Sequence, residues 1–141
     1  MRSKRELTEL LGAVDLFSRC SRAELKTVTR HVETVRLDPG IELTHQGDPG
    51  DAFYVILDGH ARVTLDGDGV DTLGPGQYFG ELALLDKAPR NATVTALTGM
   101  EVVVLGQREF GGLIDEVPGF ARKLLAGMAR RLRDQDAKSV Q

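Results

Sequence analysis

The chain has 141 residues, of which 41% are hydrophobic, and it carries 18 Lys and Arg against 21 Asp and Glu. This length suits one domain with its own core. No apolar run approaches the roughly 18 residues of a membrane helix, and no charge excess indicates disorder, so we expect a folded chain without a membrane span. With no secretory signal and a single cysteine, we expect a cytoplasmic protein without disulfides.

Two short helices are predicted over residues 1–31. The first has apolar residues at helical spacing, namely Leu7, Leu10, Leu11 and Val14. Ser21 followed by Glu24 has the spacing of a capping box, in which the serine caps the N-terminus of the helix and the glutamate bonds back to the serine's backbone N–H. The second helix is therefore expected to begin just after Ser21.

The hydrophobic period changes at Val32, and short strands separated by turn residues follow. The predicted strands are 32–37, 41–44, 52–57, 61–65, 70–73, 77–79, 92–97 and 100–105. We interpret Asp58-Gly59, Asp66-Gly67-Asp68-Gly69 and Thr98-Gly99 as hairpin turns. About eight short strands are typical of a sandwich or jelly roll, so we expect an eight-stranded antiparallel β-roll over residues 32–106.

The helical period returns over residues 107–136. One helix is predicted for 107–117, and a long one follows Pro118 with an apolar face of Phe120, Leu124, Met128 and Leu132. Residues 118–141 contain six Lys and Arg against two Asp. We interpret these cations as favourable interactions with the dipole at the C-terminal end of a helix rather than as a nucleic-acid contact. The whole is expected to be one α+β domain spanning residues 1–141.

Residues 79–93 interrupt the strand pattern with chemistry suited to a phosphate. Gly80 lets the backbone approach a ligand closely, and residues 81–85 have the propensity for one helical turn, whose first amides suit an anion. Arg90 adds a planar, forked cation that matches phosphate oxygens. Glu81 accepts hydrogen bonds from hydroxyls, so a ligand with both a phosphate and a ribose would use both charges.

The sequence Phe-Gly-Glu-Leu-Ala-Leu-Leu, followed by Pro-Arg-Asn-Ala-Thr, resembles the phosphate-binding cassette of cyclic nucleotide-binding domains. That family includes the catabolite activator proteins and the regulatory subunits of cyclic AMP-dependent kinase. The resemblance extends to residues 46–59 and 128–132 and covers roughly residues 16–135. It implies a sensor or regulatory domain that binds cyclic AMP, is not an enzyme, and responds by moving its last helix as a lid.

The resemblance also implies a role for each site residue. Glu81 would accept from the ribose 2′-hydroxyl, Arg90 would pair with the phosphate oxygens, and Gly47, Gly50 and Gly59 would serve backbone turns. The expected ligand-binding residues are Phe79, Gly80, Glu81, Leu82, Ala83, Arg90, Asn91, Ala92, Arg131 and Gln135, the last two reaching the base from the final helix. Asn91 could meet either purine, so selectivity for cyclic GMP stays open.

Other classes of function are kept as alternatives. A cupin-like metal-binding roll would need clustered ligands, but His31, His45 and His60 are far apart and expected to face solvent, so we predict no metal site, no catalytic residues and no cofactor besides the ligand. No recognition helix follows the long helix, so nucleic acid is not an expected partner. The effector protein or output domain is unidentified, and a homodimer through the C-terminal helix is possible.

Overall fold

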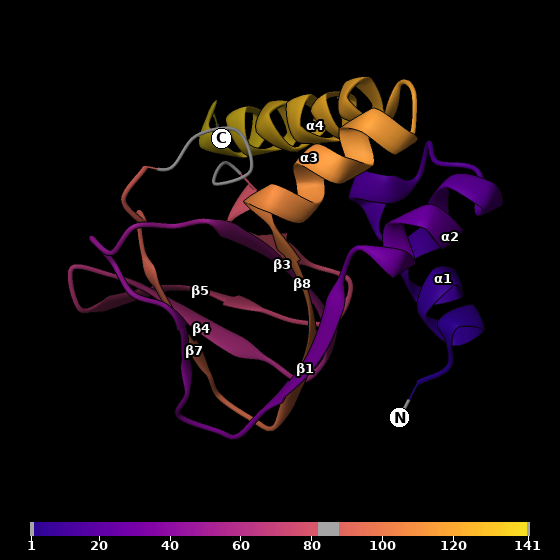
Figure 1. Cartoon of the computed structure of the whole chain (residues 1–141). Helices are drawn as coiled ribbons and strands as arrows, with labels where there is room; N and C mark the ends of the chain where they lie inside the picture. Colours follow the sequence, from indigo (N-terminus) through magenta and orange to yellow (C-terminus); the bar gives the residue numbers. More distant parts are fainter. Residues whose placement is uncertain (1, 82–87, 141) are drawn as a thin grey trace. The chain divides into compact units, whose positions relative to one another are not determined.

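Antiparallel strands form two four-stranded sheets in the middle of the chain (Figure 1). A computed structural model describes residues 2–81 and 88–140, and for Arg131 and residues 135–140 it describes the backbone alone. One sheet has the order β1-β8-β3-β6, with bounds Glu33–Leu37, Met100–Gly106, Ala52–Asp58 and Tyr78–Phe79. The other has the order β2-β7-β4-β5, with bounds Glu42–Thr44, Thr93–Ala96, Ala61–Leu65 and Asp68–Leu73. The predicted α+β roll is confirmed.

Position in the sheet explains the composition of the strands. The near-continuous apolar sequences of β3 and β8 belong to the two central strands of the first sheet, which are buried along most of their length. Strand β5 lies at the edge of the second sheet and exposes Asp68 and Asp71. Charges on an edge strand discourage pairing with another chain.

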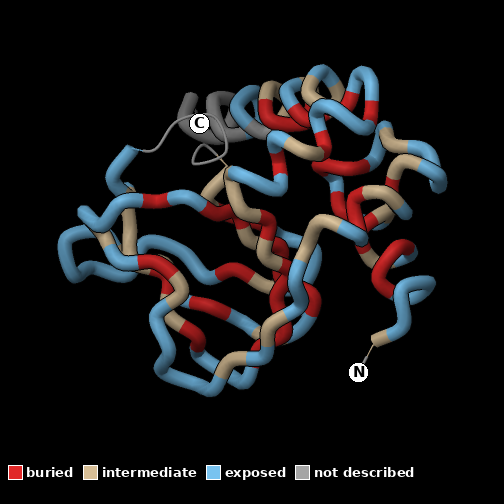
Figure 2. The backbone as a smooth tube through the Cα atoms, in the orientation of Figure 1, coloured by how far each residue is buried: buried red, intermediate tan, exposed pale blue. Residues whose placement is uncertain are grey.

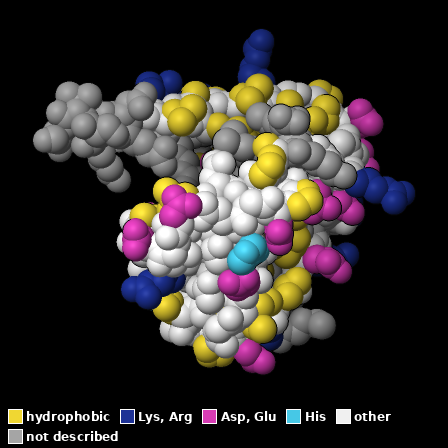
Figure 3. Space-filling model, turned by 90° about the vertical axis from the view of Figure 1, so that its left-hand side faces the viewer, with side chains coloured by type: hydrophobic (Ala, Val, Ile, Leu, Met, Phe, Trp, Pro, Cys, Tyr) yellow, Lys and Arg dark blue, Asp and Glu magenta, His cyan; other side chains and the backbone are white. Residues whose placement is uncertain are grey.

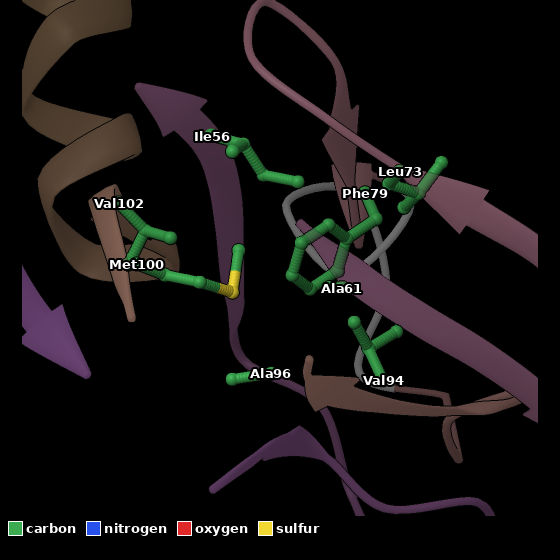
Figure 4. Packing of buried hydrophobic residues seen from close by; sticks show 8 residues of the cluster. All are labelled: Ile56, Ala61, Leu73, Phe79, Val94, Ala96, Met100 and Val102. Atoms are coloured by element: carbon green, nitrogen blue, oxygen red, sulfur yellow. The ribbon is translucent and has the colours of Figure 1, made fainter. Parts of the chain in front are cut away.

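The core of the roll lies between the two sheets. It contains Ile56, Phe79, Met100 and Val102 from the first sheet and Ala61, Leu73, Val94 and Ala96 from the second, all of them buried. Figure 4 shows these side chains pointing toward one another from the facing strands. Because Phe79 belongs to this core, the backbone is fixed immediately before residue 80.

One of the three predicted hairpins is confirmed, although its turn is shorter than the predicted residues 66–69, because Asp68 and Gly69 belong to β5. Strands β4 and β5 pair with Leu65 opposite Asp68, which leaves Asp66 and Gly67 as a two-residue turn. Both turn residues have positive φ, 53° and 85°, as a type I′ turn requires.

The other two predicted hairpins are wrong. Strands β3 and β4 belong to different sheets, and so do β7 and β8. The turns at Asp58-Gly59 and Thr98-Gly99 therefore carry the chain across the sandwich, and they lie beside each other, since Leu97 N donates to His60 O over 2.9 Å. Turn residues indicate that the chain reverses direction. They do not indicate whether the strand after the turn pairs with the strand before it or joins the facing sheet.

The helices belong mainly to a second unit. The chain divides into two compact units, Met1–Arg30 with Gly111–Gln141, and His31–Phe110. The helices are α1 (Lys4–Gly12), a 3₁₀ turn η1 (Asp15–Phe17), α2 (Arg22–Arg30), α3 (Gln107–Glu116) and α4 (Phe120–Val140). The sequence did not predict η1, whose three residues are too few to show a period. That residues 1–141 behave as one domain stays a prediction.

The apolar face predicted for the last helix is only partly buried. Phe120, Leu124 and Met128 are buried, and Phe17 stacks on Phe120 with ring centroids 6.3 Å apart. Buried positions recur in this way along the helices in Figure 2. Leu132, however, is 60% exposed, so the buried face ends at Met128, and α4 continues beyond the predicted end at Asp136. Its use in a homodimer stays a prediction. Within residues 2–81 and 88–140, no helix combines the length and hydrophobicity needed to cross a membrane.

The capping box at α2 is confirmed and predicts a pH-dependent stability. Ser21 N donates to Glu24 Oε1 over 2.8 Å, Glu24 N donates to Ser21 Oγ, and Lys123 Nζ also donates to Glu24. The hydrogen bond from Lys123, and then that from the Ser21 backbone, lower the pKa of Glu24 below its ordinary value of 4.5. A lowered pKa means that the carboxylate stabilises the fold above pH 4.5 and that this contribution is lost as the pH falls through the folded-state pKa.

We expect Glu24→Ala to lower the free energy of unfolding by about 1 kcal/mol at pH 7. The loss should shrink as the pH falls below the range in which Glu24 is ionised. Urea unfolding of both proteins at pH 7 and pH 3 measures this difference. Glu33→Ala, which removes an exposed acid of β1, is the control. An equal loss at both pH values would contradict an ionic role for Glu24.

Candidate functional site

The backbone around Arg90 is fixed by a loop that precedes β3. Gly47 N donates to Arg90 O over 2.9 Å, and Arg90 N donates to Asp48 O over 2.8 Å. Pro49 and Pro89 form an antiparallel bridge between the same two segments. Two segments about forty positions apart in the sequence therefore hold each other in register. These hydrogen bonds fix the position of the Arg90 backbone, from which its side chain extends.

The Arg90 side chain is half-buried and held from two directions. Its Nη2 donates to the Ala52 carbonyl over 2.8 Å, and its guanidinium carbon lies 5.8 Å from the centroid of the Tyr54 ring. The Tyr54 ring in turn stacks on Phe79 at 5.0 Å, and its hydroxyl donates to Leu43 O. A guanidinium over an aromatic face is favourable, so strand β3 sets the orientation of the arginine.

Among the described residues, Arg90 has no carboxylate within ion-pair distance. The Ala52 carbonyl accepts from one of its Nη atoms, and an arginine has five N–H donors. A half-buried cation that keeps most of its donors unused is suited to an anion with several oxygens, which two parallel N–H groups can bind together.

Two glycines make room for this side chain. A Cβ atom on Gly50 would lie 2.5 Å from Arg90 Nε, and one on Gly80 would lie 2.7 Å from Arg90 Nη1. Gly80 also has φ +81°, which side chains disfavour. Gly47 and Gly59 have positive φ, as their predicted turn roles require, but Gly50 does not. The prediction that Gly50 serves a turn is therefore wrong, because what requires a glycine there is the space for Arg90.

The other predicted site residues fall in different places. Glu81 is half-buried and directly follows Gly80, which touches Arg90; Asn91 is exposed, and Ala92 is half-buried with its carbonyl accepting from Thr44 Oγ1. Phe79 is in the core, so its ligand contact stays a prediction. Leu82, Ala83 and most of the predicted helical turn over 81–85 lie outside the described residues. Arg131 and Gln135 are on α4, with side chains outside the described part.

Three contributors to the site were not predicted, namely the steric role of Gly50, the Ala52 carbonyl and the Tyr54 ring. The sequence pattern gave part of the signal for Tyr54. It is the one half-buried residue between the buried residues of β3, at a position where an aromatic side chain can cover a neighbouring group. The carbonyl and the glycine carry no signal in the local sequence, because their roles arise from a contact with a residue 38 or more positions away.

No group of three His, Cys, Asp or Glu side chains that could hold a metal ion occurs within the described residues. His45 and His60 are exposed, as expected, whereas His31 is half-buried. The expectation that all three face solvent is thus wrong for His31, which lies between α2 and β1 where the helical unit meets the first strand in the sequence. Figure 3 shows one face of the molecule, over which Asp and Glu side chains are scattered.

The fold and the site together define a β-roll domain with a half-buried arginine whose remaining N–H donors suit an anion. The chain belongs to the cyclic nucleotide-binding domain family, whose model matches residues 34–117. Over 85% of its length it is 34% identical to the cAMP-dependent protein kinase regulatory subunit of Hypocrea atroviridis, and the match covers 26% of that relative. The chain thus spans about a quarter of this relative's length.

Solved structures show the same likeness. The N-terminal domain of a transcriptional regulator from Streptomyces coelicolor A3(2) superimposes with a TM-score of 0.80 at 31% identity, covering 92% of this chain and 94% of that one. The regulatory domain of Toxoplasma gondii PKA, crystallised with cAMP, gives a TM-score of 0.70 at 32% identity, covering 78% of this chain and 44% of that one. The family resemblance inferred from residues 79–93 is therefore confirmed.

Proposed function

We propose that this domain is a regulatory sensor that binds cyclic AMP without converting it. The observation that carries the proposal is Arg90, a half-buried cation oriented by Ala52 and Tyr54 and lacking a carboxylate partner among the described residues. In the proposed complex Arg90 binds the exocyclic oxygens of the cyclic phosphate, and Glu81 accepts from the ribose hydroxyl. The regulatory domain of Toxoplasma gondii PKA, which was crystallised with cAMP, supports this choice of ligand.

Cyclic GMP is the second candidate ligand, because Asn91 is exposed next to Arg90 and its amide can both donate and accept. Titration calorimetry with cyclic AMP, cyclic GMP and 5′-AMP separates the possibilities. We expect the tightest binding for cyclic AMP and the weakest for 5′-AMP, whose phosphate is not closed into a ring. Absence of heat with both cyclic nucleotides would refute the function, and tighter binding of cyclic GMP would reverse the selectivity.

We further infer that ligand binding changes the conformational equilibrium of α4. Arg131 and Gln135 of that helix are the proposed contacts to the base, so the ligand would favour the conformation in which these contacts form. The change would then be passed to an effector protein or a further domain. Amide hydrogen exchange of residues 120–140, with and without cyclic AMP, tests this. Slower exchange on binding is expected, and exchange that stays the same at saturating ligand would contradict a lid role.

A further inference from the structure

A groove of about 450 Å³ is lined by residues of α1 and α2 and has no part in the proposed site. Five cations line it, namely Lys4, Arg5, Arg22, Lys26 and Arg30. All five are exposed, and no acidic residue is among the lining residues. A volume of this size is within the range of natural binding sites.

The cations of α2 are arranged in a way that costs the helix stability. Arg22, Lys26 and Arg30 are spaced by four residues and lie on one face of the helix, where like charges repel. Among the described residues, neither Arg22 nor Lys26 has a carboxylate within ion-pair distance, and Arg30 reaches Glu116 only at 4.0 Å. The acid of this helix, Glu24, is occupied by Ser21 and Lys123. An external anion would relieve this repulsion.

The remaining lining residues of the groove are two cations of α1 and two threonines. Lys4 also has no ion-pair partner among the described residues, and Arg5 pairs with Glu9 at 3.7 Å on an exposed surface. The buried Thr8 and Thr29 lie at the floor, and their hydroxyls donate to carbonyls of their own helices over 2.8 Å and 2.7 Å. These hydroxyl hydrogens are therefore used, which leaves the five cations as the groups of the groove available to an anion.

The spacing of the cations points to an extended ligand. Arg22 and Arg30 are eight residues apart, which is about 12 Å along a helix. A single phosphate can reach only one end of that distance, whereas four residues of extended peptide span about 13 Å. No aromatic residue lines the groove, so it lacks the stacking surface that single-stranded nucleic acids use.

The helical unit that contains the groove carries an excess of positive charge. Residues 31–110 contain 13 Asp and Glu against five Lys and Arg, whereas residues 1–30 and 111–141 contain eight against 13. We propose that the groove between α1 and α2 binds an extended, Asp- and Glu-rich peptide segment of a protein partner. This inference does not depend on the identity of the nucleotide.

Fluorescence anisotropy of the full chain with fluorescein-labelled hexaglutamate at 50 mM salt tests the proposal. We expect saturable binding that the double variant Arg22→Gln, Lys26→Gln weakens about tenfold, because each exposed charge pair contributes a modest amount. Raising the salt should weaken binding as well. The matched control is Arg122→Gln, Arg133→Gln, which removes two exposed cations of α4 outside the groove and should change affinity less than twofold.

Stability distinguishes loss of a site from loss of the fold. Because the double variant removes like-charge repulsion, its midpoint of thermal unfolding should be unchanged or higher. No binding of hexaglutamate, or equal weakening in the control, would overturn the proposal. Tighter binding of inorganic triphosphate or of a single-stranded oligonucleotide, lost in the double variant, would overturn it in favour of a phosphate ligand. Cyclic AMP titration of the double variant should match the wild type, which keeps this test separate from the proposed function.

Discussion

Arg90→Ala is expected to abolish cyclic AMP binding at micromolar ligand while leaving the fold intact. Truncation removes the cation from a site where the phosphate would otherwise be left without its charged partner, and a loss of that kind costs roughly 3–5 kcal/mol. Because about 1.4 kcal/mol corresponds to a tenfold change in Kd, the affinity should fall by roughly a hundredfold to a few thousandfold. Titration calorimetry measures the affinity, and circular dichroism reports whether the roll is retained.

Two further variants sharpen this result. Arg62→Ala removes an exposed arginine of β4 and should leave the affinity unchanged. Arg90→Lys keeps the charge but loses the planar fork, so its affinity should fall between those of the wild type and Arg90→Ala. If Arg90→Ala binds cyclic AMP as tightly as the wild type, Arg90 does not contact the phosphate, and the proposed site is wrong.

Gly50→Ala is expected to weaken cyclic AMP binding although Gly50 is not proposed to touch the ligand. Its Cβ atom would lie 2.5 Å from Arg90 Nε and 2.6 Å from Cζ, so the guanidinium has to leave the position that Ala52 and Tyr54 give it. Overpacking of this kind costs about 1–3 kcal/mol, which corresponds to a loss of affinity of roughly five- to 150-fold. Calorimetry of the variant measures it.

A second glycine provides the control for Gly50→Ala. A Cβ atom on Gly111, within α3, would meet nothing within 4 Å. Gly111→Ala should therefore leave binding unchanged and raise the stability by about 0.5–1 kcal/mol, because alanine favours a helix. If Gly50→Ala binds like the wild type, the side chain of Arg90 adapts freely, and its fixed orientation is not needed for affinity.

Local patterns were sufficient to predict the strands and the α-helices, apart from some of their ends, and the segment 79–93, whereas the three-residue turn η1 was missed. Three features that depend on neighbours in the sequence were found, namely the capping box at Ser21 and Glu24, the hairpin between β4 and β5, and the alternating strands. The segment 79–93 stood out because a glycine, an acid and an arginine interrupt a strand pattern in an order suited to a nucleotide.

Pairings across the sandwich were not predictable in the same way. Whether the strand after Asp58-Gly59 pairs with its predecessor or crosses to the facing sheet depends on which apolar faces cover each other, and turn residues carry no information on that. The same holds at the site, where the need for a glycine at position 50 exists only because Arg90 returns to this point from a distant segment. Contacts of this kind are properties of the folded chain.

The position of Phe79 inside the sandwich, with Gly80 as the very next residue, has a consequence for how sensitivity to the second messenger evolves. Hydrophobic volume deep in the roll sets where residue 80 stands and hence how much space Arg90 has. We therefore expect natural variation at interior positions to change the affinity for the proposed ligand through Arg90, while the residues proposed to contact the ligand stay the same.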